Sequence, residues 1–259
     1  MEKLDQLFHK LLGMPVLASE NGRDVDRLII WIHYLMIALF IGWFAYFIYA
    51  LWRFRAKRQP KADHLGVRNH ASNYVELVVA GVEFGLLIFA VQLWARSSNV
   101  TQIPDADDAV TVQVVAQQFD WNFRYPGPDG VFGRQDMQWV STANPFGVDP
   151  NDPAGADDVQ VMTEMRVPVD KPVILYISSK DVIHSFKVIA LRVTQDAIPG
   201  MRIPTWFNVT DEGTYQINCA QLCGNGHYGM SRGLLIAESQ ENYEKWLRSK
   251  SGAVIESFE

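Results

Sequence analysis

The apolar residues of this chain follow two patterns, long unbroken runs near the start and short alternating runs later. Residues 28–52 carry no formal charge, and this run exceeds the roughly 20 residues that cross the hydrocarbon core of a bilayer. A second, less purely apolar run covers residues 77–95. We therefore predict an N-terminal segment at residues 1–27, followed by a transmembrane helical hairpin at residues 28–97.

Basic side chains crowd the connection between the two apolar runs. They are Arg53, Arg55, Lys57, Arg58, Lys61 and Arg68. Such a cluster beside a membrane span favours the cytoplasmic side, and this setting makes a nucleic-acid site the weaker interpretation. Both ends of the hairpin are then expected outside, on the periplasmic face of a bacterial inner membrane that the chain crosses twice.

The chain from residue 98 to residue 259 shows the second pattern, which is typical of short strands separated by Gly and Pro turns. The clearest runs are residues 110–116, 172–178, 205–210, 213–218 and 233–238. Helical spacing returns only at residues 241–250, where Tyr243, Trp246 and Leu247 share one face. Many short strands favour an all-β barrel or sandwich, and a long Pro-, Gly- and Asp-rich loop is expected at residues 126–158.

Charge is divided unevenly between the two regions. Residues 1–97 have a net charge of +3 and residues 98–259 a net charge of −9. An acidic outer domain is a poor nucleic-acid binder and can attract a basic partner. Alternatively, the negative charge has no partner and only keeps the domain soluble, since a net charge favours solubility.

The most informative stretch runs from Cys219 to Met230. It holds both cysteines of the chain, Cys219 and Cys223, followed by His227 and Met230. Thiolate, imidazole and thioether ligands together favour copper. A disulfide between the cysteines would close a very short loop that suits disulfide geometry poorly, and zinc sites rarely recruit methionine.

The pattern Cys-x-x-x-Cys-x-x-x-His-x-x-Met resembles the dinuclear copper loop of subunit II of haem-copper cytochrome c oxidases. A second string that resembles this family is Asp-Val-Ile-His-Ser-Phe at residues 181–186, and a third is Asp-Ala-Ile-Pro-Gly at residues 196–200. The resemblance implies a cupredoxin-like Greek-key barrel at residues 98–259 after the membrane hairpin. It also implies two copper ions per chain, held by His184, Cys219, Cys223, His227, Met230 and the backbone carbonyl of Gln221.

Two positions depart from the family pattern. Most members have glutamate where this chain has Gln221, and that carboxylate reaches a magnesium ion, so magnesium binding here is doubtful. The family usually has tryptophan, where electrons enter from cytochrome c, at the position of Phe119. Trp121 is retained, and we expect Phe119 and Trp121 to mark this point, with barrel packing as the alternative role.

An acidic residue, Glu76, borders the second apolar run. The resemblance implies that Glu76 lies at the mouth of a proton path into subunit I, and a solvated interfacial carboxylate is the alternative. Glu83 lies seven residues later, hence on the same helical face.

The resemblance predicts a subunit II that accepts electrons from cytochrome c, or a similar small donor, and passes them to haem in subunit I. Oxygen would be reduced to water there, with proton translocation. The sequence has no Cys-x-x-Cys-His motif for haem attachment. Three other functions compete with this interpretation. Quinol oxidase subunits lack the copper ligands, and a copper-delivery protein would need an exposed Met or His cluster. A subunit that carries the copper pair but delivers electrons to another enzyme, such as a nitric oxide reductase, remains an alternative.

Overall fold

The computed structural model describes residues 7, 9–61, 64, 70–97 and 103–251. The chain forms two compact units. The first consists of residues 1–14 and 24–97, and the second of residues 15–23 and 98–259. Each unit is described separately below.

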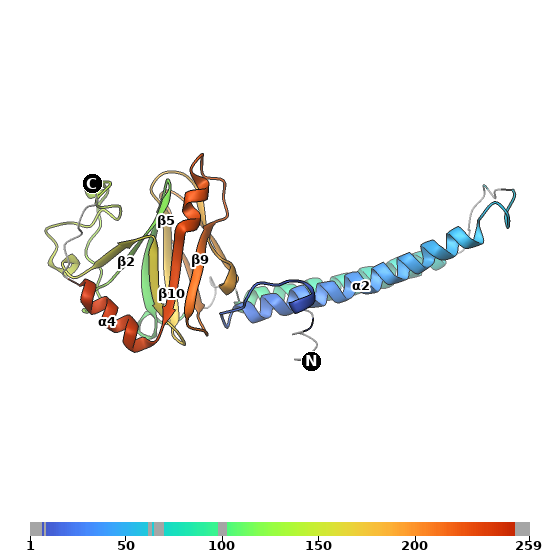
Figure 1. Ribbon diagram of the computed structural model, residues 1–259, viewed down its shortest axis with the longest axis horizontal. Helices are drawn as coiled ribbons and strands as arrows, with labels where there is room; N and C mark the ends of the chain where they lie inside the picture. The colour runs from blue at the N-terminus through green and yellow to red at the C-terminus, as the bar shows by residue number, and fades with distance from the viewer. Residues whose placement is uncertain (1–6, 8, 62–63, 65–69, 98–102, 252–259) are drawn as a thin grey trace. The chain divides into compact units, whose positions relative to one another are not determined.

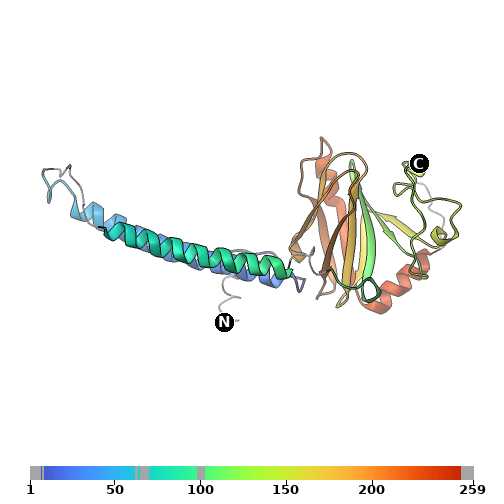
Figure 2. The same cartoon turned by 180° about the vertical axis from the view of Figure 1, so that it is seen from behind.

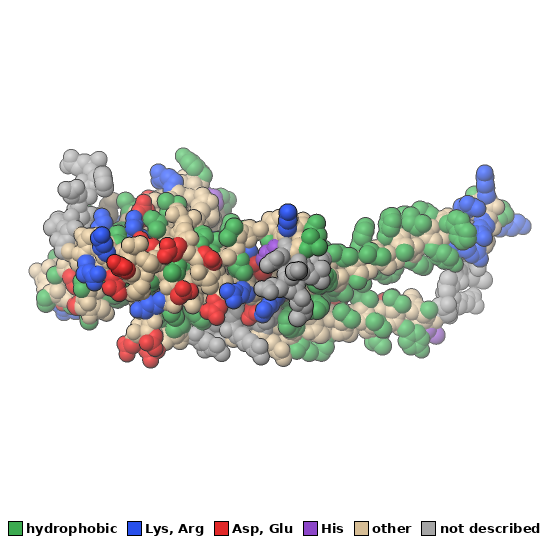
Figure 3. Space-filling view, turned by 60° about the horizontal axis from the view of Figure 1, so that its bottom comes forward, with side chains coloured by type: hydrophobic (Ala, Val, Ile, Leu, Met, Phe, Trp, Pro, Cys, Tyr) green, Lys and Arg blue, Asp and Glu red, His purple; other side chains and the backbone are tan. Residues whose placement is uncertain are grey.

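The first unit is built on two long helices, α2 (Gly22–Arg53) and α3 (Ala71–Ser97). They overlap in Figures 1 and 2 and run alongside each other in the turned view of Figure 3. Both are long and apolar enough to cross a membrane, and their apolar side chains point outward along their length (Figure 3). The predicted runs at residues 28–52 and 77–95 lie within these helices.

Basic side chains follow the end of α2, as predicted (Figure 3). The guanidinium of Arg58 lies 3.9 Å from the centre of the Trp52 ring, and that of Arg53 lies 5.4 Å from the Phe54 ring. These contacts place cationic groups over aromatic rings at one end of the apolar helix, a favourable arrangement. Arg68 lies outside the described residues.

The second unit is a β domain of two five-stranded sheets, with strand orders β3-β2-β1-β5-β8 and β4-β10-β9-β6-β7. The first sheet comprises β1 (Val110–Gln117), β2 (Asp120–Tyr125), β3 (Val159–Met162), β5 (Pro172–Ser179) and β8 (Ile203–Asn208). The second comprises β4 (Glu164–Pro168), β6 (His184–Val188), β7 (Val193–Ala197), β9 (Gly213–Cys219) and β10 (Gly233–Glu238). The pairs β1–β5 and β4–β10 are parallel, whereas the other pairs are antiparallel. This architecture confirms the predicted all-β cupredoxin-like class preceded by a helical hairpin.

The core of the domain is formed by apolar side chains of both sheets. On β1, Val112, Val114 and Ala116 are fully buried at alternate positions, because successive side chains of a strand point to opposite faces. Helix α4 (Gln240–Lys250) covers part of the domain, as Figure 1 shows. Its Trp246 ring meets that of Tyr125 at 5.1 Å between centroids. The helix predicted at residues 241–250 is therefore confirmed.

Residues 15–23, which lead into α2 and include its first two residues, belong to the β domain. The N–H of Ala18 donates to the carbonyl of Ala190, and the N–H of Glu20 donates to that of Asn208, at 2.8 and 3.1 Å. Ala18 is fully buried and Ser19 almost so. This segment lies within the predicted N-terminal region 1–27, and its packing on the β domain was not anticipated from the sequence.

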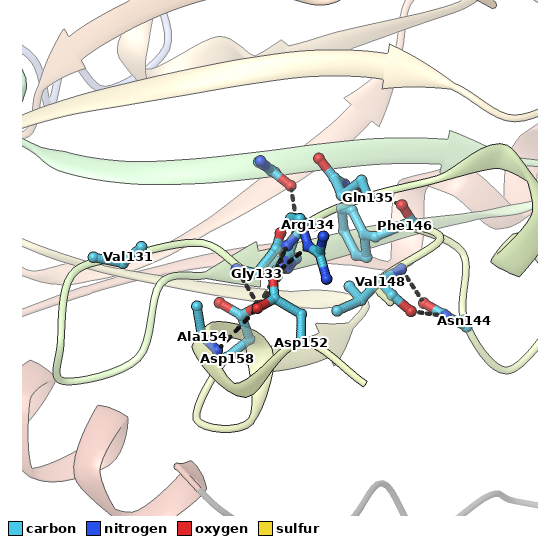
Figure 4. Close-up of polar contacts among 12 residues, drawn as sticks. Val131, Gly133, Arg134, Gln135, Asn144, Phe146, Val148, Asp152, Ala154 and Asp158 are labelled. Atoms are coloured by element: carbon cyan, nitrogen blue, oxygen red, sulfur yellow. Dashed lines mark hydrogen bonds and ion pairs between the residues drawn. The ribbon is translucent and has the colours of Figure 1, made fainter. Parts of the chain in front are cut away.

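The long loop expected at residues 126–158 connects β2 to β3, and Figure 4 shows polar contacts within it around Asp152 and Asp158. A buried ion pair anchors the loop to β2. The Arg124 guanidinium contacts Asp158 and also donates to Gln113 and to the carbonyl of Gly133. Both members of the pair are almost completely buried. Removing one partner of such a pair typically costs about 3–5 kcal/mol, because the other charge remains buried.

Candidate metal centre

The cysteine stretch forms a loop between β9, the central strand of the second sheet, and its neighbour β10. We call residues 219–230 the copper loop. Cys219 is the last residue of β9, and residues 227–232 form the short helix η5 (His227–Arg232) before β10. Gly224 has a φ of 138°, which side chains rarely allow. The loop can therefore fold back so that its donors converge.

Four side-chain donors face one another at this loop. The Sγ atoms of Cys219 and Cys223 are 3.9 Å apart. The Nδ1 atom of His184 lies 4.0 Å from the Cys219 sulfur, and that of His227 lies 3.3 Å from the Cys223 sulfur. Metal–sulfur and metal–nitrogen bonds of roughly 2.0–2.3 Å suit donors at such separations. Both cysteines are free thiols, so the predicted ligands His184, Cys219, Cys223 and His227 are brought together.

The two weaker predicted ligands lie in the same loop. The carbonyl oxygen of Gln221 is 3.0 Å from the Cys219 sulfur. Met230 is fully buried, and its carbonyl accepts a hydrogen bond from the Trp121 indole at 3.0 Å. Soft sulfur together with imidazole nitrogen makes this donor set fit copper.

The orientation of His184 is fixed by Asp181. The Nε2 atom of His184 lies 2.9 Å from an Asp181 oxygen, so Nε2–H donates to the carboxylate and Nδ1 faces Cys219. A carboxylate behind a metal-binding imidazole sets its tautomer in this way. Burial lowers the pKa of His184, but its bonds to Cys219 and Asp181 outweigh this effect and the net shift is upward. For Asp181, burial raises the pKa, but the Gln118 N–H and His184 bonds give a net lowering.

The two thiols are electrostatically different. Burial raises the pKa of Cys219, but hydrogen bonding with the protonated His184 ring and with neighbouring backbone groups lowers it by more, so the net shift is downward. Burial and the adjacent charge of Cys219 raise the pKa of Cys223 to about 11. Without metal, Cys219 is therefore the more acidic thiol, and Cys223 holds its proton at neutral pH.

The aromatic residues predicted at the point of electron transfer lie beside this loop. Trp121 is fully buried, and its ring packs edge-on against His184 at 6.2 Å between centroids. Phe119 is half-buried, and its ring lies so close to Gly226 that an added Cβ there would be 2.4 Å away. Phe119 is thus nearer the surface than Trp121.

Glu76 belongs to the helical unit, in the second turn of α3. It is exposed in the isolated chain, as is Glu83 seven residues later. Their spacing keeps both carboxyl groups on one face of α3.

Two residues that contact the ligands were not assigned a role from the sequence. Asp181 orients His184, and its position three residues before that histidine, inside the family-like string, was an available signal. Gln118 donates from its side chain to the carbonyl of Cys223 at 2.7 Å. No local pattern marks this contact, because 105 residues separate the partners.

The aspartates of the 126–158 loop bind other protein groups. Arg134 pairs with Asp149 and Asp152, and Asp152 also caps the short helix η3 (Pro153–Gly155). Among the described residues, the one cluster of three His, Cys, Asp or Glu donors within metal-binding reach is His184, Cys219 and Cys223. The loop carboxylates therefore stabilise the loop itself.

The sequence profile described as "Cytochrome C oxidase subunit II, periplasmic domain" matches residues 110–236. The cytochrome c oxidase subunit 2 of Cereibacter sphaeroides is 32% identical over 221 residues, which cover 81% of this chain and 70% of that protein. The chain belongs to the cytochrome c oxidase subunit II family. This finding confirms the family resemblance carried by the three sequence strings, and the family is a copper-binding one.

Two further relatives extend the comparison. The alternative cytochrome c oxidase subunit 2 of Bradyrhizobium diazoefficiens is 39% identical over 144 residues, 55% of this chain and 52% of that protein. The match therefore spans about half the length of that relative. The solved periplasmic domain of cytochrome oxidase subunit II from Bradyrhizobium japonicum is 28% identical, with a TM-score of 0.42, over 57% of this chain and 96% of that domain.

Proposed function

We propose that this chain is the copper-bearing subunit II of a membrane-bound haem-copper oxidase. It would accept electrons from cytochrome c, or a similar small donor, and deliver them to haem in subunit I for reduction of oxygen to water coupled to proton translocation. The observation that carries the proposal is the convergence of two thiols and two imidazole Nδ1 atoms at 3.3–4.0 Å.

The proposed ligands are His184, Cys219, Gln221 through its carbonyl, Cys223, His227 and Met230. Copper held by these residues would supply one-electron redox chemistry. The protein contributes a rigid frame, since Cys219 ends a central strand and His184 begins the strand beside it. Burial of both cysteines shields the thiolates from water and oxidants.

We further propose that electrons enter at the surface near Phe119, with Trp121 packed beneath it against His184. The support is the half-buried Phe119 ring against the copper loop and the edge-on contact of Trp121 with His184. Phe119 would act as an apolar contact for the donor, because its ring carries no polar group.

The remaining proposals concern the membrane side and the second metal. Glu76 would take up protons at the cytoplasmic end of α3, beside the basic loop that favours that side. The β domain would face the periplasm of a bacterial inner membrane. Gln221 offers an uncharged amide where the usual glutamate would hold magnesium, so magnesium should bind weakly there, if at all.

The test uses the full chain, purified in detergent and loaded with copper. We expect two coppers per chain, with an electron paramagnetic resonance spectrum in which one unpaired electron couples to both nuclei. Cys223→Ser should abolish the shared spectrum, whereas Met137→Leu, at a side chain 83% exposed and outside the site, should preserve it. One copper with mononuclear splitting in the unaltered chain would contradict the proposal.

A further inference from the structure

Gln118 connects the two chain segments that carry the candidate metal ligands. Its side-chain Nε2 donates to the carbonyl of Cys223 at 2.7 Å. Its backbone N–H donates to one carboxylate oxygen of Asp181, also at 2.7 Å, while the other oxygen of Asp181 accepts from His184. One residue is thus tied to the copper loop on one side and, through Asp181, to His184 on the other.

The frame that holds Gln118 is rigid. It follows directly on β1, the middle strand of the first sheet, which pairs in parallel with β5 up to Ala116 and Ser179. The N–H of Lys180 then donates to the carbonyl of Ala116 at 2.9 Å. Gln118 and Asp181 therefore lie just beyond the ends of β1 and β5, two strands whose register is fixed by their pairing.

The copper loop is held much less firmly at this point. Leu222 is 81% exposed. In the part of the chain that the structure describes, the Gln118 amide provides the one hydrogen bond that joins residues 221–226 to a residue outside the copper loop. The approach is close, since a Cβ added to Gly224 would lie 2.9 Å from the Gln118 Nε2 atom. Losing the amide would therefore remove this bond and leave the segment around Cys223 to be held by packing, including contact with the Phe119 ring.

We propose that Gln118 is a positioning residue of the metal centre. Its amide holds the Cys223 carbonyl, and with it the Cys223 thiol, at a fixed place relative to His184 before any metal binds. The inference rests on the proposed function for its link to copper, and extends it by naming the residue that joins the two halves of the ligand set. Preorganised ligands bind metal more tightly because less ordering remains to be done.

The test compares two replacements of similar length in the full chain in detergent. Gln118→Met removes the donor, and Gln118→Glu places a carboxylate against the carbonyl. We expect copper loss to a chelator to be about tenfold faster in Gln118→Met, as is usual when an outer partner of a ligand is removed, and faster still in Gln118→Glu. The hyperfine splitting should change in both variants.

Gln117 provides the matched control. It is the preceding residue, the last of β1, and the described structure gives its side chain no hydrogen bond. Gln117→Met and Gln117→Glu should lose copper at the unaltered rate. Wild-type retention and hyperfine splitting in Gln118→Met would overturn the proposal, even if Gln118→Glu is impaired, because charge alone would then explain the effect.

A copper-free measurement separates this inference from the proposed function. Alkylation of Cys223, quantified by mass spectrometry in the metal-free chain, should be faster in Gln118→Met than in the unaltered protein or in Gln117→Met. Near-ultraviolet circular dichroism checks that each variant is folded. Failure of the unaltered chain to bind two coppers would refute the proposed function, whereas unchanged Cys223 alkylation in folded Gln118→Met would refute the positioning role.

Discussion

At the scale of single residues, the thiols of Cys219 and Cys223 differ in their pKa and therefore in how tightly each holds its proton. Cys219 faces Nδ1 of His184, and the protonated ring can donate there to a thiolate, which lowers the pKa of Cys219, whereas a charge on Cys219 raises the pKa of Cys223. A metal must displace the proton of Cys223 before that sulfur can bind. The site is therefore only partly prepared for a cation at neutral pH.

This difference predicts how copper affinity depends on pH. The pKa of Cys223 is about 11, so binding releases its proton throughout the neutral range, and at lower pH the raised pKa of His184 adds a second proton to displace. Affinity should rise about tenfold per pH unit for each proton released. Chelator competition at several pH values between 6 and 9 measures the slope, and an affinity that stays flat over this range would contradict the assignment.

The proposed ligands could be predicted from the sequence because five of the six lie within twelve consecutive positions, and the sixth, His184, lies in a recognisable string. Gln118 and Asp181 act through contacts that depend on the ends of β1 and β5 lying side by side. That pairing joins residues about 60 positions apart, and no periodicity in the chain encodes it. Gln118 and Asp181, which hydrogen-bond to the proposed ligands, could therefore be identified only from the structure.

At the scale of elements, the turn between β1 and β2 packs directly on the copper loop. The Phe119 ring occupies the space that a side chain at position 226 would need. Gly226 itself has a negative φ of −94°, so the backbone conformation would tolerate another residue. Contact with Phe119, and not backbone strain, requires glycine there.

We expect Gly226→Ala to displace the copper loop. Overpacking of this kind typically costs about 1–3 kcal/mol, and it should appear as faster copper loss and a lower melting temperature in the full chain. Gly229→Ala is the matched control, because a Cβ there would meet nothing nearer than 3.8 Å. The double variant Phe119→Ala with Gly226→Ala should recover copper retention; no recovery would show that the ring is not the obstacle.

Strands with alternating or β-branched apolar residues were predicted, and others were missed for a physical reason. Nearly every residue of β2 is buried, including Asn122 and Arg124, so its sequence does not alternate. Strand β7 reads Val-Thr-Gln-Asp-Ala and lies at a sheet edge, where polar residues are tolerated. Tertiary pairing, more than local pattern, makes these segments strands.

At the scale of the whole molecule, the β domain is completed by a segment from the far end of the chain. Ala18 is fully buried among core residues of the domain. The carbonyl of Ala18 accepts from Thr210, and its N–H donates to Ala190. The domain is therefore not contained within residues 98–259.

A charge at position 18 should destabilise the β domain, although this position lies outside residues 98–259. Ala18→Asp buries an unpaired carboxylate and should lower the free energy of local opening by about 3 kcal/mol. Hydrogen exchange of β8 in the full chain, followed by mass spectrometry, measures this loss. Val16→Asp, at a side chain 73% exposed, is the control, and equal protection in both variants would contradict the role of the segment.

The bonds of residues 18–20 to residues 190, 208 and 210 also constrain how the protein is made. The segment is synthesised before both apolar helices, and its partners after them. Where both helices cross a membrane, the segment and its partners meet only when both crossings are made, because a hairpin with one helix left uninserted would place them on opposite sides of the bilayer. Such a chain would carry an open, protease-sensitive β domain. A completed β domain would therefore indicate that both helices had been inserted correctly.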